Sequence, residues 1–248
     1  MKSSFLVSMM ALLLGLASVG AAEKVYTPPV LPEGINPATY PMPRDDWYAR
    51  VQNNFNRTQG KQFDLIFDGD SITDGWQGKG KEVWAQRYGA LNAANFGIGG
   101  DRTEHVLWRL GKGQVDGMNP KLIVLMIGTN NSGRDTADQI AEGVKAVVNE
   151  YLKRCPNSKL LLLAIFPRSE KPTDAIRAKL AEVNTKISAL ADGKRVTYLD
   201  IGAKFLSPDG TLSRDIMPDF LHPNEKGYQI WADAIQSVID SYFAAAKK

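Results

Sequence analysis

The sequence is poor in cysteine and in histidine, and both shortages restrict its chemistry. Its 248 residues include one cysteine, Cys155, which cannot form an internal disulfide. Stability must therefore come from an apolar core, which a chain of this length can supply. The two histidines, His105 and His222, stand far apart and no cysteine cluster accompanies them. A structural zinc site of the Cys/His type is therefore not expected.

An excess of one charge is also lacking. The chain has 30 basic and 27 acidic residues, a net charge of +3, without a run rich in lysine and arginine. This balance argues against a nucleic-acid partner. With 44% hydrophobic and 23% charged residues, the composition is that of a globular protein and excludes collagen-like and disordered classes. The length allows one large domain or two small ones.

The N-terminus has the composition of a targeting segment. Lys2 precedes the apolar residues 5–16, and small residues occupy positions 18–22. This pattern predicts a secretory signal peptide over 1–22 and a secreted or periplasmic protein. The alternative is an uncleaved anchor, but the apolar stretch is short for a span of about 20 residues. We expect no stable membrane insertion after cleavage.

Residues 23–44 are rich in proline. They hold six of the 13 prolines in the chain: Pro28, Pro29, Pro32, Pro37, Pro41 and Pro43. Because proline lacks an amide donor and has a fixed φ, this segment is predicted to be neither a helix nor a central strand. It is interpreted as an extended arm, either a simple linker or a segment with a role of its own, leading into a domain over 45–248.

Strand-like and helix-like segments alternate through that domain. Strands are expected at 63–67, 90–96, 122–127, 160–165 and 196–199. Helices are expected at 45–57, 82–88, 103–110, 136–152, 174–191 and 225–243, the last with Asn224 as its N-cap. The alternation predicts a single three-layer α/β/α domain with a mostly parallel five-stranded sheet. In such sheets the active site lies at the carboxyl ends of the strands.

A serine follows the first predicted strand in the sequence Gly69-Asp70-Ser71. This is not the Gly-x-Ser-x-Gly elbow, because Thr73 stands where the second glycine belongs. A serine in a turn can simply cap a helix. To act as a nucleophile it needs a neighbouring base.

The two histidines are the candidates for that base. His105 lies in a predicted helix among charged residues and is interpreted as a surface residue. His222 follows Asp219 by three positions, so the aspartate can turn back and hold one ring nitrogen while the other faces Ser71. Asp219 would then select the tautomer and stabilise the imidazolium.

Two further strand ends carry groups that could stabilise an oxyanion. The second strand ends in the glycine-rich residues 97–101, and Asn130 follows the third strand. Glycine lets the backbone turn tightly and present amides, and an asparagine side chain can donate as well. Both segments could equally be ordinary turns. A dinucleotide site is not indicated, since Arg102 replaces the last glycine of that motif.

The order of these segments resembles the SGNH hydrolases, also called GDSL esterases and lipases, over roughly residues 62–243. The four motif blocks are Gly69-Asp70-Ser71, Gly97-Ile98-Gly99-Gly100-Asp101, Gly128-Thr129-Asn130 and Asp219-Phe220-Leu221-His222. Within the family, the run from Asn95 to Asp101 looks most like the catalytic subunits of intracellular platelet-activating-factor acetylhydrolase. The signal peptide and the arm depart from that subfamily.

The resemblance implies a flavodoxin-like SGNH fold and a role for each matched residue. Ser71 matches the nucleophile, and its own amide matches one oxyanion donor. Gly100 matches a second backbone donor and Asn130 the side-chain donor. His222 matches the general base, with Asp219 as its partner. The implied reaction is a two-step acyl transfer that needs no metal and no organic cofactor.

Three residues beside the catalytic positions bear on the substrate. Ile72, Thr129 and Leu221 could crowd the acyl side and favour a short acyl group such as acetyl, or they could simply be core. Export makes acetylated glycans a reasonable substrate class, with a lipid or lysophospholipid ester as the competitor. The expected partner is thus a small-molecule or glycan ester. The sequence does not choose between a monomer and a homodimer.

Two functions of other classes remain open on sequence grounds. A magnesium-dependent phosphatase could use Asp68 as nucleophile and Asp70 as acid/base, although no acidic pair for Mg²⁺ follows the later strands. A non-catalytic carbohydrate-binding module could use the five tryptophans as stacking faces. Such a module has no need for a serine, a histidine and an aspartate to converge.

Overall fold

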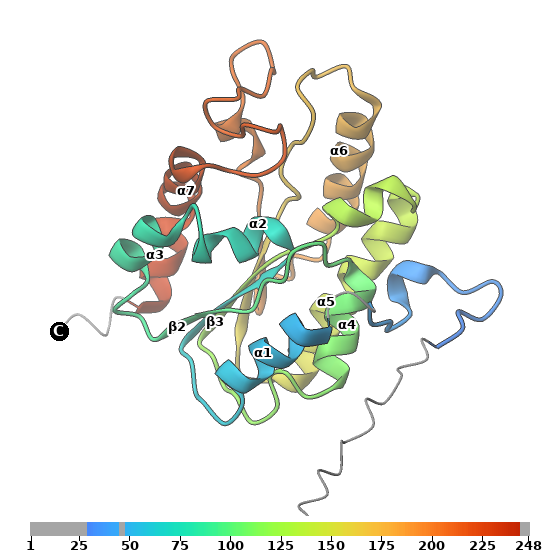
Figure 1. Ribbon diagram of the computed structural model, residues 1–248, viewed down its shortest axis with the longest axis vertical. Coiled ribbons are helices and arrows are strands. Elements are labelled where there is room, and N and C mark those ends of the chain that lie inside the picture. The colour runs from blue at the N-terminus through green and yellow to red at the C-terminus, as the bar shows by residue number, and fades with distance from the viewer. Residues whose placement is uncertain (1–28, 45–47, 244–248) are drawn as a thin grey trace, which may run out of the picture.

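Five short segments pair as the strands of one parallel sheet in the order β2-β1-β3-β4-β5 (Figure 1). The computed structural model describes residues 29–44 and 48–243, so the predicted signal peptide lies outside the described residues. The strands are β1 (Leu65–Gly69), β2 (Ala93–Asn95), β3 (Leu122–Met126), β4 (Lys159–Leu163) and β5 (Val196–Leu199). The predicted α/β architecture with a five-stranded parallel sheet is confirmed.

Helices cover both faces of the sheet. They are α1 (Tyr48–Thr58), α2 (Ser71–Asp74), α3 (Lys81–Arg87), α4 (Thr103–Gly111), α5 (Ala137–Arg154), α6 (Ala175–Ser188) and α7 (Glu225–Phe243). Helices α3 and α7 lie on one side and α4, α5 and α6 on the other (Figure 1). Short 3-10 turns are η1 (Pro37–Thr39), η3 (Gly75–Gln77), η4 (Thr129–Gly133) and η5 (Gly202–Phe205).

Alternate residues of each strand face opposite layers, as the pleat requires. In β1, Ile66 packs into the apolar cluster with α4, α5 and α6, whereas Leu65 and Phe67 pack into the cluster with α3 and α7. Strands β1 and β3 are buried along their whole length. This explains why the central strands appear as nearly continuous apolar runs in the sequence.

Strands β3 and β4 lie within two residues of their predicted bounds, and β1 and β2 differ in ways that matter for the site. The expected strand 63–67 is found at 65–69, because the carboxylate of Asp68 is paired within the core instead of ending the strand. The expected strand 90–96 is reduced to the three-residue β2 at the edge of the sheet. The shift of β1 moves the strand end directly to the turn that carries Ser71.

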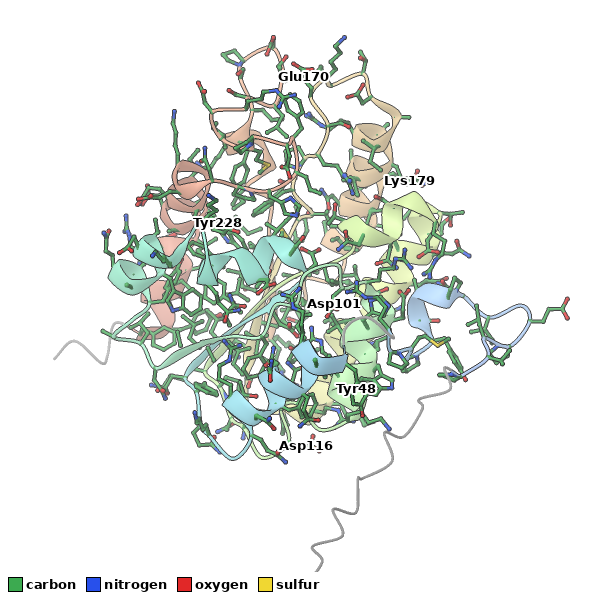
Figure 2. The ribbon with its side chains drawn as sticks, in the orientation of Figure 1. Tyr48, Asp101, Asp116, Glu170, Lys179 and Tyr228 are labelled. Atoms are coloured by element: carbon green, nitrogen blue, oxygen red, sulfur yellow. The ribbon has the colours of Figure 1, made fainter. Side chains whose placement is uncertain are left out.

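The last helix begins as predicted. Asn224 Oδ1 accepts the backbone N–H of Gly227 (3.1 Å), which is the N-cap geometry. On the same helix, the Tyr228 hydroxyl donates to the Ile72 carbonyl (2.7 Å), so α7 is tied to α2 (Figure 2).

Within residues 29–44 and 48–243, the helices are all too short or too polar to span a membrane.

Candidate active site

The turn after β1 presents Ser71 as the first residue of α2. Asp70 caps this helix, since its Oδ1 accepts the backbone N–H of Ile72 (3.0 Å). A Cβ on Gly69 would overlap the carbonyl oxygen of Met126 and the hydroxyl of Thr73. Only glycine therefore allows the chain to pass so close to β3 and turn the serine out of the strand.

Ser71, His222 and Asp219 form one hydrogen-bonded chain. Ser71 Oγ lies 2.8 Å from His222 Nε2, and His222 Nδ1 lies 2.6 Å from Asp219 Oδ2. The serine and the histidine are 151 positions apart in sequence and meet at the carboxyl edge of the sheet. This is the arrangement of a nucleophile, its base and the group that orients the base.

The loop holding the histidine is fixed by its own aspartate. Asp219 Oδ1 accepts the backbone N–H groups of His222 (2.7 Å) and Leu221 (3.1 Å). Phe220 takes the left-handed region with φ of 58°, and the Arg214 guanidinium lies 4.3 Å from the centre of its ring. The tight turn places the carboxylate and the imidazole on one side, as the three-residue spacing predicts.

Electrostatics keep Asp219 ionised. Partial burial raises the pKa of this carboxyl, but hydrogen bonds from the His222 ring and from two backbone amides outweigh burial and leave the pKa below its ordinary value. The His222 and Asp219 side chains are 42% and 56% exposed. The Asp219 carboxylate is thus charged, and both side chains are open to a substrate.

The glycine loop, residues 97–101 after β2, lies beside the serine turn. The Ile98 amide donates to the Gly69 carbonyl (3.2 Å), which joins the loop to the end of β1. Asn130 Nδ2 donates to the Asp101 carbonyl (2.9 Å), which joins it to the segment after β3. Figure 2 shows Asp101 near the middle of the molecule.

Donors remain available at this junction. Among the described residues, the backbone amides of Ser71 and Gly100 have no hydrogen-bond partner. Asn130 uses one of its two side-chain N–H groups on Asp101 and retains the other. These are the three groups that the sequence resemblance implies as oxyanion donors.

The three residues expected on the acyl side differ in accessibility. Ile72 and Thr129 are each 1% exposed, and Ile72 belongs to the core cluster beneath α2. Leu221 is partly exposed and packs against the same cluster. Only Leu221 therefore has surface that a substrate could contact without a rearrangement.

Sequence reasoning missed Arg168, which follows β4 at the same edge of the sheet. Its Nη1 donates to the Thr129 carbonyl (3.2 Å). Its charge also acts on the 1% exposed Asp70. Burial raises the pKa of Asp70 to about 7 although the Ile72 amide opposes this; Asp101 adds to the rise and Arg168 offsets it. The position of Arg168 after a strand is the signal that could have found it.

The interpretation of His105 as a surface residue is wrong. The residue is only 3% exposed, and its Nδ1 accepts a hydrogen bond from the Arg102 backbone amide (2.9 Å) at the start of α4. Burial, together with nearby arginines that include Arg44 and Arg102, lowers the pKa of His105 to about 3. His105 is therefore a neutral structural residue that closes the first turn of α4.

The geometry also disfavours Asp68 as a phosphatase nucleophile. The residue is fully buried, and its carboxylate accepts hydrogen bonds from Arg109 Nη2 (2.9 Å) and from the Tyr151 hydroxyl. A nucleophile must reach its substrate, whereas this carboxylate is occupied by hydrogen bonds inside the core. Two tryptophans considered for a binding module, Trp76 and Trp231, are 1% exposed and are core residues.

Comparison with known proteins gives a consistent result. The sequence model of the GDSL-like lipase/acylhydrolase family matches residues 67–230. Platelet-activating factor acetylhydrolase IB subunit alpha1 of Homo sapiens is 36% identical over 211 residues, 82% of this chain and 90% of that protein. Subunit alpha2 of Gallus gallus is 39% identical over 194 residues, 75% of this chain and 83% of that protein.

Solved structures share the fold at lower identity. A GDSL-like lipase from Bacteroides thetaiotaomicron superposes with a TM-score of 0.63 at 19% identity, covering 79% of this chain and 98% of that one. An acetylxylan esterase from Geobacillus stearothermophilus gives 0.58 at 20% identity, covering 73% and 94%. At such identity the likeness concerns the fold alone.

The comparison also corrects one prediction. The expected secreted or periplasmic location is wrong. The curated relatives are subunits of platelet-activating factor acetylhydrolase IB, and the sequence motifs resemble the intracellular form of that acetylhydrolase. The prediction rested on a short apolar stretch, which is a signal of composition, and that stretch lies outside the described residues.

Proposed function

We propose that this chain, which belongs to the GDSL-like lipase/acylhydrolase family, hydrolyses short-chain acyl esters, acetyl esters above all, through an acyl-enzyme on Ser71. The chain is an ester hydrolase by that membership. The observation that carries the proposal is the continuous chain of hydrogen bonds from Ser71 Oγ through His222 to Asp219. A nucleophile, a base and an orienting carboxylate are what acyl transfer requires.

In the first step, Ser71 Oγ attacks the carbonyl carbon of the ester while His222 Nε2 takes the hydroxyl proton. Asp219 accepts the hydrogen bond from Nδ1–H, which leaves Nε2 as the acceptor toward the serine. The ionised carboxylate also stabilises the imidazolium that forms. His222 then protonates the departing alcohol as the carbon–oxygen bond breaks.

The negative charge that develops on the carbonyl oxygen needs donors. The amides of Ser71 and Gly100 and the free side-chain N–H of Asn130 are proposed to supply them. Groups that are held in place before the reaction stabilise such charge without reorganisation, and loss of one typically lowers kcat by about 10²–10³-fold. The N-terminal position of Ser71 in α2 directs its amide away from the helix.

In the second step, water attacks the acyl-enzyme with His222 as base, and Ser71 recovers its proton. The exposure of His222 and Asp219 supports this step, because water reaches them directly. The cycle uses no group beyond the side chains and amides already described.

The proposal specifies a short acyl group. Ile72, which follows Ser71, and Thr129, which precedes Asn130, are each 1% exposed, so neither side chain lines an open channel for a long acyl chain. The names of the relatives, which are acetylhydrolase subunits, support the same acyl size. The carbohydrate expectation rested on export and loses that support, so the alcohol is left to a substrate panel.

The test is a panel of p-nitrophenyl esters from acetate to octanoate, together with acetylated oligosaccharides and a lysophospholipid. Wild type and Ser71→Ala are compared, and both are treated with a fluorophosphonate. We expect hydrolysis that declines with acyl length, loss of activity in Ser71→Ala, and one phosphonate adduct in wild type alone. Wild-type protein that is folded but neither hydrolyses an ester nor accepts the phosphonate would refute the proposal.

A further inference from the structure

Arg44 stands where the proline-rich arm meets the glycine loop. We propose that Arg44 is a positioning residue: it holds the peptide between Gly99 and Gly100 so that the Gly100 amide faces the oxyanion. The arm would then be part of the active-site scaffold. The inference rests on the proposed acyl transfer at Ser71.

The arm is packed against the domain before it reaches Arg44. The turn η1 contacts α4 and α5, and Ala38 is fully buried there. The Ala38 carbonyl accepts the Thr103 hydroxyl (2.7 Å), and Asn36 Nδ2 donates to Glu142 Oε2 (2.8 Å). A Cβ on Gly143 would come within 2.9 Å of the Ala38 Cβ, so glycine in α5 makes room for the arm. The segment leading to Arg44 is therefore anchored.

The guanidinium of Arg44 binds two successive carbonyls of the glycine loop. Nη1 donates to the Gly100 oxygen (2.6 Å) and Nη2 to the Gly99 oxygen (3.2 Å). A Cβ on Gly100 would overlap Nη1, so glycine at 100 provides the space for this contact. The planar fork of arginine suits two acceptors at once, which a lysine ammonium with its different geometry does not reproduce.

This contact determines where the Gly100 amide points. The Gly99 carbonyl and the Gly100 N–H belong to one planar trans peptide, so they point in opposite directions. Holding the Gly99 oxygen toward the arm directs the Gly100 N–H away from it. A charged donor on the carbonyl also polarises the peptide and strengthens the N–H as a donor.

The loop needs such an external constraint. Two consecutive glycines have no side chain to restrict them, and Gly100 takes a φ of +80°. The flanks are held by the Gly99 amide on Asp74 Oδ2 (3.1 Å) and by the Asp101 amide on the Ile98 carbonyl (3.1 Å). Between these bonds, Arg44 supplies the contacts to the carbonyls of the two glycines.

The test compares wild type with Arg44→Ala, Arg44→Lys and the control Arg87→Ala. Arg87 pairs with Asp233 between α3 and α7, so the control loses an arginine on a different face. Hydrolysis of p-nitrophenyl acetate gives kcat and KM, and thermal unfolding gives Tm. For chemical rescue, guanidinium chloride is added to each variant at a millimolar concentration that leaves the Tm of wild type unchanged.

We expect Arg44→Ala to lower kcat by about 10–100-fold with KM within about twofold, because the oxyanion forms only after binding. Arg44→Lys should remain low, guanidinium should restore part of the Arg44→Ala rate, and Arg87→Ala should match wild type. A kcat for Arg44→Ala within about twofold of wild type would overturn this inference and leave the proposed function standing. Full activity of Arg44→Lys would do the same. If Arg44→Ala does not fold, Arg44→Lys still decides the question. An inactive wild type would instead overturn the proposed function, and this inference with it.

Discussion

The carboxylate of Asp68 lies 2.9 Å from Arg109 Nη2, and both side chains are fully buried below the turn that carries Ser71. Arg109 also binds Asp101 Oδ2 through Nε (2.9 Å), so one guanidinium joins β1 to the glycine loop. Burial opposes the charged form of Arg109, but Asp68 and Asp101 outweigh it and raise its pKa above the ordinary value. The core beneath the candidate active site thus contains a paired charge network.

Removal of this arginine should destabilise the fold strongly. Arg109→Met leaves two buried carboxylates without their cation, and the free energy of unfolding should fall by about 3–5 kcal/mol. Urea denaturation of wild type and variant measures this. Arg87→Ala, which breaks a partly exposed pair, should cost less than about 1 kcal/mol. Equal costs for the two variants would contradict the assigned role of Arg109.

Asp219→Asn should abolish most activity without affecting binding. The amide cannot hold Nδ1–H as a carboxylate does, so the wrong tautomer is favoured and kcat should fall by about 10³–10⁴-fold at a similar KM. Steady-state kinetics on p-nitrophenyl acetate measure the change. Asp209→Asn, on an exposed turn, is the matched control and should be as active as wild type. A loss of less than tenfold in Asp219→Asn would rule out this role for Asp219.

Asp70 should make the protein less stable as pH rises toward neutrality. Its folded pKa, about 7, exceeds the unfolded value of 3.8, so the folded state binds the extra proton between these values. The stabilisation is complete below pH 3.8 and is lost as pH rises to about 7, by about 1.4 kcal/mol for each pH unit.

Asp70→Asn tests this, because the amide keeps an acceptor for Ile72 but does not titrate. Urea denaturation at pH 5, 6 and 7 should show wild type losing stability relative to the variant. Parallel curves for the two proteins would mean that Asp70 is ionised throughout.

Leu221→Ala should extend the acyl range. Removing the partly exposed side chain beside His222 opens space near Ser71, and one or two added methylenes should gain about 10-fold in relative kcat/KM. The ratio of butyrate to acetate hydrolysis measures the effect. Leu206→Ala, which truncates another partly buried leucine of the same cluster, should leave the ratio unchanged. An unchanged ratio in Leu221→Ala would place the acyl group elsewhere.

The sequence alone was sufficient for the fold class and for the family. Strands β1, β3 and β4 are buried on both faces and so carry apolar runs that are visible in the local sequence. The Asp219–His222 spacing lies within one turn, so their contact was also predictable. The limits of β1 were not, because Asp68 continues the strand only by pairing with Arg109, which is 41 positions away.

What the linear order of residues determined is local: which segments are strands, and which polar residues end them. Tertiary structure decided the rest, because it depends on contacts between distant segments. Four features are of this kind: the burial of His105, the charge network around Arg109, the position of Arg168 and the hydrogen bonds from Arg44 to the glycine loop. No local pattern specifies which partner a charged side chain finds across the fold, since the partner is chosen by packing.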